Sequence, residues 1–195
     1  MKRTNLVAAM MLSFGLTIVG AAYAGPATDV VKAKQTALYD LLQKPGNETK
    51  IAATLDQVLD HEAIAKASLG SEWDARSDAE KAQFSDLLKQ LVRKSYERNI
   101  KKTLGYNIEY IGETEKNLQV IVKSKAVSKT DKRADPIEIE YALAQKDGKW
   151  VIQDITTDGV SLVSSYRSQF TKIVKKDGFP KLISKMKDKI AKGDV

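Results

Sequence analysis

The sequence contains no cysteine and only one histidine among its 195 residues. Without cysteine it has no disulfides, no thiolate metal ligands and no cysteine nucleophile. His61 alone cannot build a histidine cluster, so a conventional zinc site is excluded as well. Glycine loops that bind phosphate are also absent. We therefore expect a fold held together by its hydrophobic core, with no metal and no cofactor.

Acidic residues are missing from the N-terminus. Two basic residues, Lys2 and Arg3, precede an uncharged apolar stretch and the tripeptide Ala-Tyr-Ala, which ends at Ala24. This order predicts a cleaved secretory signal peptide over residues 1–24. An uncleaved membrane anchor is the alternative, because the stretch approaches spanning length. Residues 25–195 are long enough for a single domain with its own core.

The charge of the chain is moderate. Its formal net charge is +7, and removal of the two basic residues of the signal peptide lowers this to +5. Lysines are interspersed with acids, without a long block of one sign, so nucleic-acid binding is not indicated. Attraction to anionic lipid or to an acidic partner is compatible with this charge but is not required by it.

Helical periodicity dominates residues 27–104. After a first helix, Asn47 is expected to cap a second one, and a short third segment stops at Gly70, a residue typical of helix C-termini. The clearest helix begins at Ser77, which can form a capping box with Glu80. An apolar stripe then continues over about six turns of this helix.

The period changes to two over residues 105–157, which predicts four strands: YNIEYI, LQVIVKSKAV, PIEIEYALAQ and WVIQDIT. In the third strand Ile137, Ile139, Tyr141 and Leu143 alternate with smaller or charged residues, so one face of the sheet is expected to be exposed to solvent. Short connections predict an antiparallel meander. Two further helices are expected within residues 160–191, at about 161–176 and 179–191. This succession predicts an α+β fold.

Candidate catalytic residues are few. Ser161 in GVSLV matches a nucleophile elbow only as far as its third position, so a serine hydrolase is not supported. Asp154, in the fourth strand, is a candidate for acid–base chemistry in an apolar pocket. The favoured interpretation of Asp154 is a capping or pairing role near the strand end. His61, beside acids at a helix start, is interpreted as solvated or hydrogen-bonded.

The C-terminal segment is rich in lysine, and its apolar residues lie at helical spacing. The lysines are Lys181, Lys185, Lys187, Lys189 and Lys192. A solvated terminal helix is the favoured interpretation, and contact with a membrane surface is the alternative. The other apolar residues belong to a core, a partner surface or a cavity for an apolar ligand, and periodicity does not choose among these.

Three segments occur in order along the chain: LGSEWDARSDAEKAQFSDLLKQLVRKSY (69–96), DGKWVIQDITTDGVSLVSSYRSQF (147–170) and DGFPKLISKMK (177–187). They contain Leu-Gly-x-x-Trp, a capped helix with Phe and a terminal Tyr, Gly-x-Trp, Asp, Gly-Val-Ser and Tyr-Arg-x-x-Phe. This combination resembles the MlaC family, also called the toluene-tolerance auxiliary family of periplasmic phospholipid-binding proteins.

The resemblance implies a cystatin-like or nuclear-transport-factor-like fold, in which helices and a twisted sheet of about four strands enclose an apolar cavity. It implies that phospholipid acyl chains occupy this cavity, and that the protein is a carrier rather than an enzyme. Family members carry lipid across the periplasm and maintain outer-membrane lipid asymmetry. The implied partners are an outer-membrane lipoprotein–porin complex and an inner-membrane ABC transporter complex with its substrate-binding subunit. A monomer is expected.

The expected lipid-binding residues come from the long helix, the inward strand positions and the segment after the fourth strand. They are Leu88, Val92, Tyr96, Tyr110, Val120, Val122, Ile139, Tyr141, Val160, Leu162, Val163, Tyr166 and Phe170. Tyr96, Val160, Tyr166 and Phe170 match the family pattern, and the others follow from alternation and helical phase.

Arg167 is expected either to contact a lipid phosphate at the cavity mouth or to pair with Asp154 or Asp158. Trp73 and Trp150 are interpreted as structural. Three functions compete with phospholipid carriage. They are carriage of another lipid such as a hopanoid, acid–base catalysis by Asp154 in a cone-shaped fold, and a lipid-free adaptor that binds a protein partner.

Overall fold

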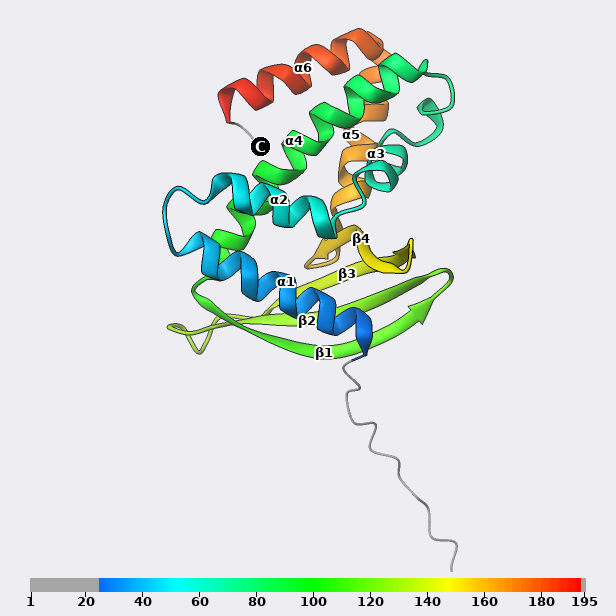
Figure 1. The fold of residues 1–195 in the computed structure, drawn as a ribbon. Helices are drawn as coiled ribbons and strands as arrows, with labels where there is room; N and C mark the ends of the chain where they lie inside the picture. The colour runs from blue at the N-terminus through cyan, green and yellow to red at the C-terminus, as the bar shows by residue number, and fades with distance from the viewer. Residues whose placement is uncertain (1–24, 194–195) are drawn as a thin grey trace, which may run out of the picture.

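A five-stranded antiparallel sheet is covered on one face by helices in the computed structural model, which describes residues 25–193 (Figure 1). The α+β fold is as predicted. The predicted signal peptide, residues 1–24, lies outside the described residues. No helix within the described part of the chain combines the length and apolar character needed to cross a bilayer.

The first two helices are α1 (Pro26–Leu42) and α2 (Glu48–Val58). Asn47 occupies the N-cap position of α2, but the prediction that its side chain caps this helix is wrong. Its Nδ2 donates instead to the backbone oxygens of Leu41, at 3.1 Å, and Lys44, at 3.3 Å. The amide thus binds backbone carbonyls at the end of α1 and in the turn after it.

The next elements are α3 (His61–Leu69), the short 3-10 helix η1 (Gly70–Glu72) and α4 (Asp78–Thr103). Gly70 ends α3 with a φ of 60°, as its position predicted. The capping box of α4 is also confirmed, because the Ser77 side chain accepts from the Glu80 amide and the Glu80 carboxylate accepts from the Ser77 amide.

The strands follow one another in the sheet: β1 (Tyr106–Lys116), β2 (Gln119–Ser128), β3 (Ile137–Lys146), β4 (Lys149–Thr157) and β5 (Val160–Ser161). Every neighbouring pair is antiparallel, which confirms the meander. The two-residue strand β5 was not predicted. It follows a turn at Asp158 and Gly159, whose φ angles of 47° and 77° suit a tight hairpin.

The inner face of the sheet packs against the helices. In β3, Ile139, Tyr141 and Leu143 are buried, whereas Glu138 is exposed on the other face. This confirms the predicted alternation. The register places Ile139 opposite Ser124 of β2, so the buried face continues from strand to strand.

Two helices complete the chain. Helix α5 (Leu162–Asp177) begins directly after β5, and α6 (Phe179–Lys192) packs against α4 and α5 away from the sheet (Figure 1). Gly178, with a φ of 84°, allows the sharp change of direction between them.

Aromatic side chains join these helices. The ring of Phe84 lies 5.5 Å from that of Phe170 and 6.4 Å from that of Phe179, measured between centroids. Trp73 adds an edge contact to Phe84 at 6.5 Å. Trp150 is half-buried against the core. Both tryptophans therefore have the packing role that was expected of them.

Candidate functional site

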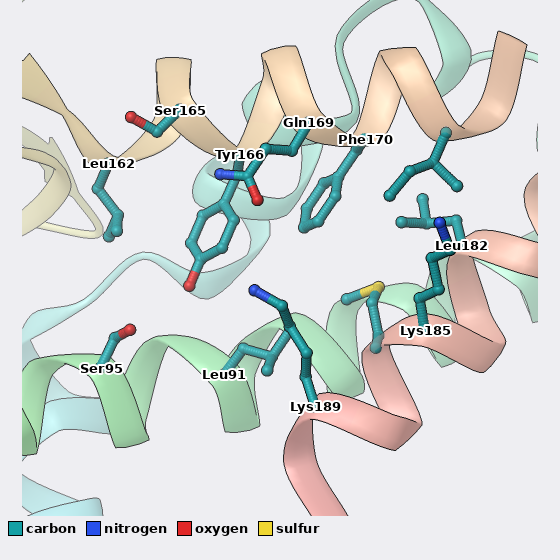
Figure 2. Close-up of a pocket in the computed structure, with 12 residues that line it drawn as sticks. Leu91, Ser95, Leu162, Ser165, Tyr166, Gln169, Phe170, Leu182, Lys185 and Lys189 are labelled. Atoms are coloured by element: carbon teal, nitrogen blue, oxygen red, sulfur yellow. The ribbon is translucent and has the colours of Figure 1, made fainter. Parts of the chain in front are cut away.

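Two apolar pockets lie side by side next to helix α4. The helical pocket, of about 280 Å³, is enclosed by α4, α5 and α6 (Figure 2). The sheet pocket, of about 420 Å³, lies between α4, the start of α5 and the inner face of the sheet. Ser95, Leu162 and Ser165 line both pockets, so these three side chains form a neck between them.

Helix α4 supplies a wall to both pockets. Leu91 lines the helical pocket, Val92 and Tyr96 line the sheet pocket, and Ser95 lies between them. Asn99 continues the row one turn further. Residues at spacings of three and four share one side of a helix, which is why a single long helix can serve both spaces.

The sheet supplies the opposite wall of the sheet pocket. Ile139 and Tyr141 of β3 line it, together with Ile137 and Ile155. Val160 lies at its solvent-facing edge, with 64% of its surface exposed. Six of the predicted lipid-binding residues line this pocket: Val92, Tyr96, Ile139, Tyr141, Val160 and Leu162.

A chain of hydrogen bonds lies beside the sheet pocket. The Tyr110 hydroxyl donates to Gln35 Oε1, and Gln35 Nε2 donates to the Tyr39 hydroxyl at 3.0 Å. That hydroxyl donates in turn to Thr103 Oγ1 at 2.7 Å. Gln35 and Thr103 line the pocket. Since these polar groups satisfy one another, they can border an apolar space without ordered water.

The tyrosine hydroxyls of the sheet pocket are uncharged. Burial, the largest cause, raises the pKa of both Tyr96 and Tyr141 above the ordinary tyrosine value. The charged residues that line this pocket, Lys102 and Asp158, are exposed. Charge is therefore confined to the rim, and the interior suits an uncharged, apolar ligand.

The helical pocket has aromatic and basic parts. The rings of Tyr166 and Phe170 stack with centroids 5.2 Å apart, and Met186 of α6 lines the same pocket. Lys185 and Lys189 of α6 also line this pocket (Figure 2), and both residues are exposed. An apolar ligand here would thus have ammonium groups beside its exposed end.

Five predicted lipid-binding residues line neither pocket: Leu88, Tyr110, Val120, Val122 and Val163. Leu88, Val122 and Val163 are buried in the hydrophobic core, and Tyr110 belongs to the hydrogen-bond chain. Val120 is half-buried against the core. Contact of these five side chains with lipid stays a prediction.

Arg167 joins α5 to α3. Its Nε donates to the backbone oxygen of Ala67 at 2.7 Å. Within residues 25–193 it forms no ion pair with Asp154 or Asp158, the two expected partners. Contact with a lipid phosphate stays a prediction as well.

Asp154 holds the start of α5. Its carboxylate accepts hydrogen bonds from the Ser161 hydroxyl and from the Val163 amide, the latter at 3.1 Å. It also accepts one from the Ile155 amide at 2.8 Å. This confirms the capping interpretation, because free amides at a helix start need acceptors. Asp154 lines neither pocket.

His61 belongs to an ion-pair group on the helices. Its Nε2 lies 2.8 Å from Asp56 Oδ1, and the same carboxylate binds Arg93 and Lys89. Burial lowers the pKa of His61, against the smaller effect of Asp56, which raises it. The hydrogen-bonded interpretation is confirmed. Among the described residues, no group of three metal-ligating side chains occurs.

The sequence reasoning missed most of the helical pocket. Leu182 and Met186 line this pocket, and their helical spacing is clear in the sequence. That spacing predicts an amphipathic terminal helix, but it does not show that the apolar side of the helix borders a pocket. Nothing in the sequence indicates that Ser95, Ser165 and Gln169 line a pocket, since a polar side chain on a helix usually faces water.

A comparison with sequence models of protein families identifies the family of this chain. The sequence model described as "MlaC protein" matches residues 27–188, from the beginning of α1 into α6. The chain belongs to the MlaC family. The match includes every element that lines the two pockets of this MlaC-family chain. A search among curated proteins finds no match.

A solved structure shares the fold. It is that of a phospholipid-binding protein from Ralstonia solanacearum, determined in complex with a phospholipid. The two structures superpose with a TM-score of 0.73 at 19% sequence identity, covering 88% of this MlaC-family chain and 100% of the other. The sheet and its helical cover are thus shared over nearly the whole domain.

Proposed function

We propose that this MlaC-family protein is a soluble phospholipid carrier. The observation that carries the proposal is the pair of adjoining apolar pockets, whose charged lining residues, Lys102, Asp158, Lys185 and Lys189, are all exposed. The Ralstonia solanacearum protein with the same fold holds a phospholipid, which supports the same ligand class here.

In the proposed complex the acyl chains occupy the sheet pocket and the helical pocket and pass the neck at Leu162. The sheet pocket, of about 420 Å³, falls in the size range typical of small-ligand sites. The phosphate lies at the mouth of the helical pocket, where Lys185 and Lys189 offer charge-assisted hydrogen bonds.

The need for such a carrier follows from the cost of hydrating acyl chains. Each methylene in water rather than in an apolar site costs about 0.8 kcal/mol. Two acyl chains hold on the order of thirty such groups, a gross penalty of about 20 kcal/mol or more. Free phospholipid therefore does not diffuse between membranes at a useful rate, and a protein that replaces water around its tails removes most of the penalty.

The proposed place of work is the periplasm, reached by export through a signal peptide at residues 1–24. The proposed partners are an outer-membrane lipoprotein–porin complex and an inner-membrane ABC transporter complex. Shuttling between them would maintain outer-membrane lipid asymmetry. Support for this part comes from membership of the MlaC family.

Native mass spectrometry of protein purified from cells tests carriage. We expect a mass increase equal to one phospholipid for each protein, and solvent extraction followed by lipid analysis should identify it. A protein that carries no lipid contradicts the proposal. Extraction of a hopanoid in place of a phospholipid contradicts the proposed ligand class.

Asp154→Asn separates carriage from acid–base catalysis. The substitution removes the carboxylate that catalysis requires, but it keeps one side-chain oxygen, which can accept from the Ile155 and Val163 amides as Oδ1 does in the wild type. We expect the same lipid-to-protein ratio as in the wild type by native mass spectrometry. Conversion of the bound lipid by the wild type, lost in the variant, would favour the enzyme.

A further inference from the structure

Positive charge is concentrated in the last two helices. Residues 162–192, which comprise α5 and α6, contain nine lysines and arginines but only two aspartates, a net charge of +7. Residues 25–161 contain twenty-one basic and twenty-two acidic side chains, a net charge of −1. All nine basic residues of α5 and α6 are exposed. One end of the molecule is therefore strongly basic, and the rest is nearly neutral.

The lysines follow the mouth of the helical pocket. On α6, Lys181, Lys185 and Lys189 are spaced by four residues and share one side of the helix. Lys185 and Lys189 of this row line the pocket itself. On α5, Lys172 and Lys176 continue the row of Gln169, which also lines the pocket. Two rows of lysines thus continue from residues that line the pocket, one row on each helix.

Most of these basic side chains form no ion pair within the described part of the chain, so they can interact with a ligand or a surface outside the protein. Among the described residues, Lys185 is the lysine of these two helices that forms an ion pair, with Asp177 at 3.9 Å. In the part of the chain that the structure describes, the large apolar side chains that are exposed, Ile111, Leu118 and Val160, all lie in or beside the sheet. The basic face therefore has charge without an exposed apolar anchor.

We propose that the basic face of α5 and α6 docks on an anionic lipid bilayer, with the mouth of the helical pocket turned toward the headgroups. The inference rests on the proposed carrier function and names the surface through which the carrier would contact a membrane. Lysine is depleted at the cores of protein–protein interfaces, which are built around buried aromatic or apolar anchors, so the face fits a bilayer better than a protein. Anionic headgroups attract such lysines within about a Debye length of the surface.

Vesicle flotation tests the docking surface. The probes are vesicles of phosphatidylcholine alone and of phosphatidylcholine with phosphatidylglycerol, each at low and high salt. We expect binding to the anionic vesicles, weakened by salt, and little binding to the neutral ones. Lys181→Gln with Lys192→Gln, two positions outside the pocket lining, should lower the partition coefficient about 25-fold, at about fivefold for each lysine.

The matched control is Lys116→Gln with Lys149→Gln, which removes the same charge from exposed strand ends, the last residue of β1 and the first of β4. This control should lower the partition coefficient by much less. Equal losses in the two double variants would overturn the proposal, since binding would then follow net charge alone. Failure of the wild type to bind anionic vesicles would overturn it too, and would leave an acidic protein as the occupant of this face.

Native mass spectrometry of the same preparations keeps the two proposals distinct. If the protein carries lipid but does not bind anionic vesicles, the docking surface is overturned and the proposed carrier function is unaffected. Protein without lipid that binds anionic vesicles through Lys181 and Lys192 would support the docking surface and contradict carriage.

Discussion

Leu162 and Val163 are neighbours in sequence but have different surroundings. Leu162 is half-buried and lines both pockets, whereas Val163 is 5% exposed and packs in the core. Successive side chains on a helix point about 100° apart, so the start of α5 contributes one residue to the neck and the next to the core. Both were expected to bind lipid, and only Leu162 lies where the pockets are.

Tryptophan at these two positions should have opposite effects. In Leu162→Trp we expect a folded protein with reduced lipid occupancy, because the indole fills the neck. In Val163→Trp we expect a loss of about 1–3 kcal/mol in the free energy of unfolding, because the core has no room for it. Native mass spectrometry and thermal unfolding measure the two quantities. Unchanged occupancy in Leu162→Trp would contradict the position of the neck.

At the scale of elements, Asp56 holds three helices together. Its carboxylate, near the end of α2, binds His61 at the start of α3 and both Lys89 and Arg93 on α4. Burial alone raises the pKa of Asp56, but hydrogen bonds from Arg93, Lys89 and His61 together outweigh burial and lower the pKa below 3.8. The ionised form is therefore the one that the folded protein stabilises.

Asp56→Asn should destabilise the protein in a pH-dependent way. A lowered pKa in the folded state gives stability that is present at neutral pH and lost as the pH falls through that pKa. At pH 7 we expect the midpoint of thermal unfolding to drop by about 2–4 °C, which corresponds to about 1 kcal/mol.

The difference from the wild type should shrink as the pH is lowered past 3.8, the ordinary aspartate value. Asp135→Asn, at an exposed loop position, is the control and should change the midpoint little at either pH. If the unfolding midpoints of Asp56→Asn and the wild type differ by the same amount at pH 7 and below pH 3.8, the loss of the ion pairs is not the cause of the destabilisation.

At the scale of the whole molecule, the pocket walls belong to different parts of the fold. Strands β3 and β4 form one wall, and α4, α5 and α6 form most of the rest, with Gln35 of α1. Figure 1 shows these helices on one side of the sheet. Strands β1 to β4 are joined by ladders of backbone hydrogen bonds with one register shift in each of the β1–β2 and β3–β4 pairs. The helices are held to the sheet by side-chain packing and by a few hydrogen bonds, such as that from the Val163 amide to Asp154. Release of lipid is therefore expected to move the helices against the sheet.

Hydrogen exchange with and without lipid measures this motion. We expect amides of α5 and α6 to exchange at least several-fold more slowly in the loaded protein, and those of β2 and β3 to change little. The lipid adds apolar contacts to the helices, and such contacts suppress local opening. Equal protection of α5 and α6 in both states would contradict this motion of the helices.

Much of the secondary structure was predictable because its causes are local. The capping box of Ser77 and Glu80 depends on residues three apart, and the alternation in β3 depends on residues two apart. The cap expected from Asn47 was wrong because its amide bonds the end of α1, several residues away. Strand β5 has two residues and is too short to show a period.

By itself, the sequence determined the α+β class, the apolar stripe of α4, the basic character of the last helix and the resemblance to the MlaC family. Only the tertiary structure decided which stripe residues face a cavity. Leu88 and Val92 lie on the same side of α4 and both are buried in the core, yet only Val92 also lines the sheet pocket. A side chain's surroundings depend on the element packed opposite, and helical phase does not contain that information.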